Sequence, residues 1–248
     1  MKAICEREKL LHAFQIVASV APSRSPKPIL QNIKLEATPE KTVLMGTDLE
    51  VGIRVEASGF EVESPGSVVL PRDRFGKILS ESSDEKLSLD SDGGKVMVRG
   101  SRSEFQLPCE NPDEFPNVAA FEEEKYHEIA TRFFREVVRR TVFATDIESS
   151  RYALGGVLLE LSESGLTAVA TDGRRLARQE GPAKAVGGHS NDANATIVPT
   201  RAMQLLDRAL ADGDENLRLA ARENDVLIHG GRVTLYSRLV EGRFPKWR

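Results

Sequence analysis

An acid, a glycine and two arginines stand side by side in VATDGRRLAR, which runs from Val169 to Arg178. A carboxylate can serve as a general acid or base, and guanidinium groups beside it can bind a phosphate group. The same residues can instead close a tight turn, because glycine accepts the positive φ that such turns require. The elements on either side must decide between a catalytic site and a structural turn.

The chain repeats itself. Residues 28–54 lie without a gap over residues 152–178, and later segments match with small drifts in spacing. A period of this kind is the signature of a duplicated structural unit. The matched pairs include Leu35/Leu159, Thr47/Thr171, Asp48/Asp172, Pro71/Pro199, Gly100/Gly230 and Arg102/Arg232.

Each copy has the pattern of a small α+β domain. Apolar residues at helical spacing predict a helix early in each copy, over residues 6–20 and 130–143, and a second helix follows Pro71 and Pro199. Alternation such as Val157, Leu159 and Leu161 predicts strands. We therefore predict two tandem repeated domains, residues 1–120 and 121–248, each with two helices packed on antiparallel sheets. The acidic, proline-containing residues 110–128 read as an exposed linker.

Composition excludes several classes of protein. The net charge of −4 argues against a protein whose whole surface is basic and binds nucleic acid, so any DNA-binding surface must be confined to part of the molecule. Only two cysteines occur, far apart, and no segment resembles a signal peptide or membrane span, which predicts a reduced, cytoplasmic setting. The histidines lack metal-ligand spacing, and no metal or cofactor is expected; they are His12, His127, His189 and His229.

A series of motifs runs through the chain in order: EREKLL, PIL, GTDLE, RY, TDGRRLA, IVP and LVEGRFP. They resemble the bacterial sliding clamp family, the beta subunit of DNA polymerase III. The resemblance implies the DNA-clamp fold and a processivity factor, a non-catalytic accessory subunit of the polymerase. It further implies a homodimeric ring of three repeats per subunit around double-stranded DNA, with clamp loader and polymerase subunits bound through short peptide motifs. This chain shows two repeats, so we expect a fragment that lacks the third domain and cannot close the ring.

The resemblance also assigns DNA-binding residues. The predicted helix over 130–143 places Arg132, Arg135 and Arg139 within about 60° of arc, opposite its apolar face, as a basic stripe. Such a stripe needs only phosphate attraction to hold a non-specific duplex. Considered alone it would be an ordinary solvated face. The residues expected to face DNA are Arg24, Arg74, Arg135, Arg139, Arg151, Tyr152 and Arg201.

Two further surfaces follow from the family pattern. One is an apolar pocket for partner peptides between the second and third domains, although Arg174 stands where histidine is frequent. Its matching positions are Leu154, Thr171, Gly173, Arg174, Arg175, Leu176 and Pro245. The other is the subunit interface, assigned to Phe105 and Leu107 on a strand at the end of the first copy. For Leu154, Leu176, Phe105 and Leu107, burial in the core of their own domain is the alternative.

Two other functions stay open at this point. A hydrolase or nuclease would use Asp48 and Asp172 as paired acids, but their equivalent positions in separate repeats would hold them a domain apart. A protein-binding scaffold that never touches DNA is the second alternative. The first copy has Thr47 and Asp48 where the second has Thr171 and Asp172. It has Leu49 and Glu50 where the second has Gly173 and Arg174. The shared acid therefore predicts a structural turn, and the residues found only in the second copy predict partner recognition.

Overall fold

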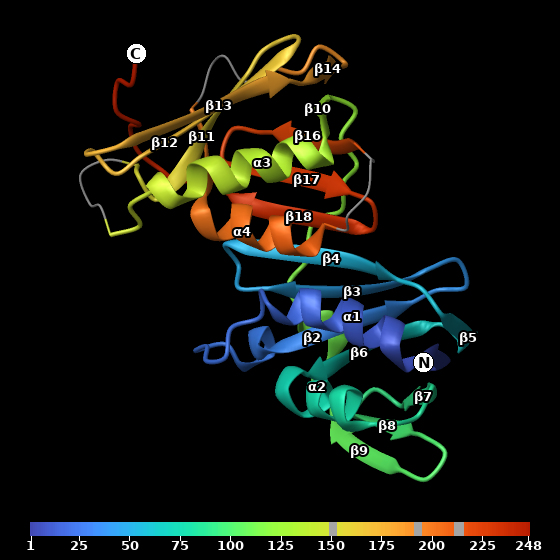
Figure 1. Ribbon diagram of the computed structural model, residues 1–248. Helices are drawn as coiled ribbons and strands as arrows, with labels where there is room; N and C mark the ends of the chain where they lie inside the picture. Colours follow the sequence, from blue (N-terminus) through green and yellow to red (C-terminus); the bar gives the residue numbers. More distant parts are fainter. Residues whose placement is uncertain (149–152, 191–194, 211–215) are drawn as a thin grey trace. The chain divides into compact units, whose positions relative to one another are not determined.

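The computed structural model describes residues 1–148, 153–190, 195–210 and 216–248 (Figure 1). It divides the chain into two compact units, Met1–Val118 and Ala119–Arg248. Each unit has its own buried core and is described here by itself.

The first unit contains two antiparallel sheets and a pair of helices, α1 (Arg7–Ala18) and α2 (Arg72–Glu81). One sheet has the order β5-β1-β7-β8-β9, with strands at Phe60–Ser64, Lys2–Glu6, Lys86–Ser91, Lys95–Arg99 and Glu104–Pro108. In the other, the strands β4-β3-β2-β6 pair in that order and span Val51–Ala57, Thr42–Thr47, Asn32–Ala37 and Gly66–Pro71.

Helix α1 buries the apolar positions that its spacing predicts, and Phe14 meets Phe75 of α2 edge to face with ring centroids 5.3 Å apart. The helix lies against β3 and β4. At Gly46 of β3 an added Cβ would stand only 2.7 Å from Cγ1 of Val17. The missing side chain at Gly46 is therefore what allows α1 to approach the sheet.

The second unit repeats this plan in the described residues, with helices α3 (Thr131–Thr141) and α4 (Thr200–Ala209). Its sheets have the orders β14-β10-β16-β17-β18 and β13-β12-β11-β15. The first set spans Lys184–Val186, Tyr126–Ala130, Asn216–Ala221, Asp225–Gly230 and Val233–Arg238. The second set spans Leu176–Pro182, Gly165–Thr171, Gly156–Leu161 and Thr196–Pro199.

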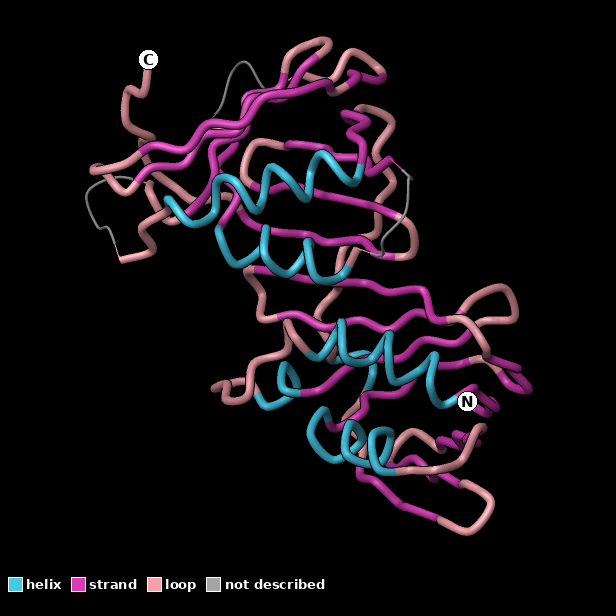
Figure 2. The backbone as a smooth tube through the Cα atoms, in the orientation of Figure 1, coloured by secondary structure: helices cyan, strands magenta, loops and turns pink. Residues whose placement is uncertain are grey.

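The duplication is exact in connectivity: β1, β2, β3, α1 and α2 have the counterparts β10, β11, β12, α3 and α4. Figure 2 shows the same succession of strand, helix, strands, helix and strands along both halves of the chain. The predicted α+β architecture of two tandem repeats with two helices in each is thus confirmed. Short 3₁₀ helices supplement it at Pro28–Gln31, Pro112–Glu114 and Val142–Ala144.

The prediction of an exposed linker over residues 110–128 was wrong at both ends. Phe115 and Val118 are 6% and 3% exposed and pack into a cluster with Val43, Met45 and Val69. Residues Tyr126–Ala130 form β10, in which His127 and Ile129 point into the core. Buried and partly exposed residues alternate over Tyr126–Ala130, which is typical of a strand, but the acidic residues before them favoured the prediction of a linker.

Candidate functional site

The turn between β12 and β13 is closed by the side chains of Thr171 and Asp172. Thr171 pairs with Leu176 at the strand ends, so Asp172 to Arg175 form the turn. The Thr171 hydroxyl donates to the carbonyl oxygen of Arg175 at 2.7 Å and accepts from the Gly173 N–H at 3.0 Å. Gly173 has φ +83°, in the left-handed region that glycine tolerates best. The predicted turn at Asp172-Gly173 is confirmed.

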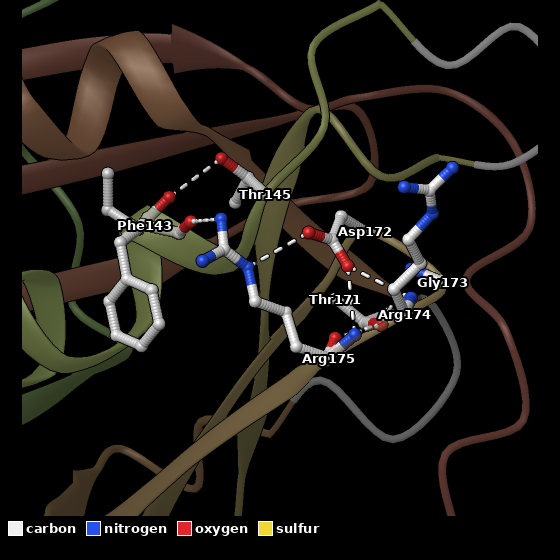
Figure 3. A network of polar contacts seen from close by, with 8 residues as sticks. Phe143, Thr145, Thr171, Asp172, Gly173, Arg174 and Arg175 are labelled. Carbon is white, nitrogen blue, oxygen red and sulfur yellow. Dashed lines mark hydrogen bonds and ion pairs between the residues drawn. The ribbon is translucent and has the colours of Figure 1, made fainter.

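The Asp172 carboxylate is part of this turn. Its Oδ1 accepts from the N–H groups of Arg174 and Arg175, both at 2.9 Å, and its Oδ2 pairs with Nε of Arg175 at 2.9 Å (Figure 3). The backbone N–H bonds from Arg175 and Arg174, ahead of the Arg175 guanidinium, lower the pKa of this carboxyl to about 2. A carboxylate engaged in this way fixes the backbone and is a poor general base near neutral pH.

The first unit contains the same turn with different side chains. Thr47 donates to the carbonyl oxygen of Val51 at 2.8 Å, and Asp48 accepts from the N–H groups of Glu50 and Val51 at 3.0 and 2.7 Å. Leu49 takes the place of Gly173 and has φ +79°, a conformation that a leucine adopts only under strain. The shared acid belongs to the fold, as the repeat predicts.

Arg175 connects the turn to the segment after α3. Its Nη2 donates to the carbonyl oxygen of Phe143 at 2.8 Å, and its guanidinium lies over the Phe143 ring, 5.4 Å from the centroid (Figure 3). Phe143 is nevertheless 57% exposed and Leu176, beside Arg175, is 48% exposed. We call Phe143, Arg175 and Leu176 the turn surface. Its apolar side chains, Phe143 and Leu176, are exposed, and Arg175 holds Phe143 to the turn. Phe143 was not among the residues predicted from the sequence for the peptide pocket.

The other predicted pocket residues do not all join this surface. Gly173 and Arg174 are exposed on the turn, whereas Leu154 is 5% exposed and lies in the core, its carbonyl oxygen accepting from Asp146 N–H at 2.9 Å. Pro245 lines a hollow of about 840 Å³ between β11 and residues 242–248, whose lining includes none of the turn residues. Burial, the alternative weighed for Leu154 and Leu176, therefore holds for Leu154 and not for Leu176.

The predicted DNA-binding residues are distributed over both units. Arg24 is exposed between α1 and the first 3₁₀ helix, Arg74 and Arg201 are exposed in the first turns of α2 and α4, and Arg139 is exposed on α3. Arg151 and Tyr152 lie outside the described residues.

Arg135 differs from the rest of the predicted stripe. Its Nε stands 3.1 Å from Oδ1 of Asp207 on α4, and the side chains are only 20% and 23% exposed. The expectation of an exposed Arg135 was wrong, because a helical wheel does not show the neighbouring helix that supplies the carboxylate. Arg132 and Arg139 retain the exposed part of the stripe.

The predicted interface strand, β9, lies at the edge of its sheet. Phe105 is 40% exposed there, while Leu107 is 6% exposed and belongs to the core of the first unit. Of the two residues assigned to a subunit contact, only Phe105 offers surface to a partner.

The described residues hold no cluster of three or more histidine, cysteine or acidic side chains placed to bind a metal ion. Within the same part of the chain, no helix is both long and apolar enough to cross a membrane. Asp48 and Asp172 lie in separate units, each bound to the N–H groups of its own turn, which removes the argument for a pair of catalytic acids.

Two family models match nearly the whole chain: the N-terminal domain of the DNA polymerase III beta subunit over residues 1–119 and its central domain over residues 128–246. The beta sliding clamp of Escherichia coli K12 is 32% identical over 251 residues, covering 100% of this chain and 67% of the relative. Among solved structures, the Bacillus subtilis sliding clamp is similar with a TM-score of 0.91 at 26% identity, over 99% of this chain and 66% of that one.

A Pseudomonas aeruginosa sliding clamp bound to griselimycin is 29% identical, with a TM-score of 0.90 over 100% of this chain and 66% of its own. The chain thus spans about two thirds of the length of these relatives. It belongs to the DNA polymerase III beta subunit family, the bacterial sliding clamps, and the predicted non-catalytic processivity subunit is thereby confirmed.

Proposed function

We propose that this chain forms part of a ring around duplex DNA and tethers DNA polymerase to it through the turn surface. The membership of the chain in the sliding clamp family supports the general role. The observation that supports the tethering site is the exposure of Phe143, whose ring contacts Arg175, and of Leu176, which follows Arg175 in the chain.

The turn surface suits a short extended peptide. Peptide grooves combine apolar contacts with a few fixed polar groups, and anchoring by two or three side chains is sufficient. Here Phe143 and Leu176 supply apolar contact, and the exposed side chains of Arg174 and Arg175 supply the polar groups. Because Thr171, Asp172 and Arg175 hold the turn, little conformational entropy is lost on binding.

The first unit lacks these features although its backbone is the same. At the matching positions it has Ser19 for Phe143 and Gly52 for Leu176, with Glu50 and Val51 replacing the two arginines. Large apolar residues exposed near its turn are limited to Leu49 itself. We therefore assign partner binding to the second unit.

DNA contact is proposed for the exposed arginines Arg24, Arg74, Arg139 and Arg201, and by family position for Arg151 and Tyr152. A sliding clamp needs weak, sequence-independent phosphate attraction, since strong contacts would oppose movement along the duplex. A chain of net charge −4 with a few exposed arginines fits weak binding. For assembly of the ring, we propose that the edge strand β9 meets a second subunit through Phe105.

The peptide site is tested by calorimetry with a peptide from the polymerase tail. We expect Leu176→Asp and Phe143→Ala to reduce the affinity at least tenfold, while Leu49→Asp in the equivalent turn leaves it unchanged. Circular dichroism verifies that each variant is folded. Equal affinity of Leu176→Asp and the unaltered chain would exclude the turn surface as the tether.

The DNA role is tested separately by crosslinking. A photoreactive residue at position 24 should crosslink to duplex DNA and lose that crosslink as salt rises. A chain that binds the peptide but never crosslinks to DNA would support the scaffold alternative.

A further inference from the structure

Two histidines that lie 62 residues apart in the sequence form a buried pair in the second unit. His127 on β10 is 0% exposed, and His189, shortly after β14, is 8% exposed. Their Nδ1 atoms stand 2.7 Å apart and their rings meet edge to face with centroids 4.9 Å apart. Nitrogen atoms at this separation must share one hydrogen, so one ring donates and the other accepts.

The outer nitrogens decide which ring donates. Nε2 of His127 lies 2.7 Å from the carbonyl oxygen of Ser162, which can only accept, so His127 carries its hydrogen on Nε2. In a neutral ring its Nδ1 then accepts from Nδ1–H of His189. That leaves Nε2 of His189 with a lone pair, which accepts the N–H of Ala221 at 3.1 Å.

The result is one directed chain of hydrogen bonds, from Ala221 N–H through both rings to the Ser162 carbonyl. It joins four places in the unit: the end of β16, the segment after β14, the middle of β10 and the turn between β11 and β12. Since β10 and β16 belong to one sheet and the β11–β12 turn to the other, the chain links the two sheets. With both histidines neutral, all four ring nitrogens and the N–H of Ala221 have a hydrogen-bond partner.

An added proton can enter this arrangement at two nitrogens. On Nδ1 of His127 it would face the N–H of His189 at 2.7 Å. On Nε2 of His189 it would oppose the N–H of Ala221, and that ring would have to donate to the Ala221 carbonyl at 3.2 Å instead. Either position for the proton breaks one bond of the chain.

The charged surroundings do little to favour an imidazolium. The residues opposite His127 in the sheet, Ala185 and Leu219, are uncharged. Burial, with His127 alongside, keeps the pKa of His189 below its ordinary value against the opposing effects of Ala221 and Glu123. Glu123 is itself paired with Arg222 at 3.1 Å. Charged residues on the surrounding elements include Glu123 before β10, Glu128 on β10, Glu163 in the β11–β12 turn, Lys184 on β14, Arg218 on β16, Arg222 and Glu223 between β16 and β17, and Asp225 at the start of β17.

We propose that the His127–His189 pair is a proton-sensitive latch, which holds Ala221 at the end of β16 when both rings are neutral and releases the Ala221 N–H when His189 takes up a proton. The proposal does not depend on the role of the turn surface. Its linkage has a definite sign: in the unfolded chain His189 takes up a proton near the ordinary pKa of about 6.5, and in the folded chain burial lowers the pKa of this ring. The contribution to the free energy of unfolding is fully present above the pKa of the unfolded histidine and is lost as the pH falls toward the pKa of the folded one. For each proton taken up, the folding constant falls by up to about tenfold per pH unit.

The test is long-range proton–nitrogen NMR on the full 248-residue chain labelled at histidine nitrogen. At pH 7.5 we expect a hydrogen on Nε2 of His127 and on Nδ1 of His189, and His189 should stay neutral at the pH where exposed His12 is half protonated. Reversed tautomers, or a pKa of His189 at or above that of His12, would overturn the proposal. This measurement needs no variant.

Amide exchange then tests the release. The protection factor of Ala221 N–H should fall at least tenfold between pH 7.5 and 5.5, measured against Leu89 in the first unit. The double variant His127→Gln/His189→Gln should lose this pH dependence, and the control His12→Asn should keep it. A fall of the same size in the double variant would contradict the latch, and if that variant does not fold, the NMR result on the unaltered chain decides.

Discussion

The guanidinium of Arg175 donates to the carbonyl oxygen of Phe143 at 2.8 Å while lying over its ring, 5.4 Å from the centroid. One side chain therefore fixes the backbone of an exposed aromatic residue at its own carbonyl group and also contacts the aromatic ring. Since Arg175 is also paired with Asp172 at 2.9 Å, the turn and the segment after α3 are held as one piece. The surface proposed for peptide binding therefore depends on this arginine.

The first prediction concerns Arg175. Its replacement by alanine should weaken binding of a polymerase-tail peptide about tenfold, because Phe143 loses its support, while the midpoint of thermal unfolding changes little at so exposed a position. Arg175→Lys should recover only part of the loss, since an ammonium group lacks the planar fork that reaches two partners at once. Arg232→Ala, an exposed arginine in the β17–β18 turn, is the matched control, and calorimetry is the measurement. Full affinity in Arg175→Ala would remove it from the site.

A second prediction uses the acid at the centre of the turn. The carboxyl of Asp172 has its pKa lowered to about 2, chiefly by the N–H groups of Arg175 and Arg174. A depressed carboxyl pKa adds stability above the unfolded value, near 3.9, and that contribution disappears as the pH falls toward 2. Carbon-13 NMR of labelled aspartate should find Asp172 still ionised at pH 3. Asp172→Asn, which can still accept both N–H bonds, should destabilise less than Asp172→Ala; an ordinary pKa would contradict the hydrogen-bonding account.

The equivalent position in the two turns gives a third prediction. Gly173 and Leu49 have φ values of +83° and +79°, and a Cβ added at Gly173 would meet no heavy atom within 4 Å. Gly173→Ala therefore causes no steric clash and only strains the backbone, which should lower the free energy of unfolding by about 1 kcal/mol. Leu49→Asn should stabilise the chain by about 0.5 kcal/mol, because asparagine tolerates the left-handed region better. Urea unfolding measures both, and effects of the same sign would show that φ is not the deciding factor.

The repeated pattern made the backbone predictable, since Thr171 and Asp172 are matched by Thr47 and Asp48 and make the same bonds in each turn. Contacts between segments distant in sequence were not predictable. Arg175 and Phe143 are 32 residues apart, His127 and His189 are 62 apart, and Arg135 and Asp207 are 72 apart. Each depends on where two loops or helices meet in space, for which a single sequence carries no periodic signal.

The fourth prediction separates two arginines of the α3 stripe. Arg139 is exposed, whereas Arg135 is held by Asp207 at 3.1 Å, so the two should contribute unequally to duplex DNA binding. Fluorescence anisotropy of a labelled duplex gives the binding constant at each salt concentration. The slope of its logarithm against the logarithm of the salt concentration should be smaller in magnitude by about 0.9 in Arg139→Ala, the effect of losing one phosphate contact. Arg135→Ala should change that slope by less than half as much and should mainly lower stability, because it leaves the half-buried Asp207 carboxylate without its partner. Asp207→Asn should strengthen DNA binding by releasing Arg135. Equal slopes for the two alanine variants would mean that Arg135 exchanges Asp207 for phosphate, and that the intramolecular pair does not remove it from the DNA surface.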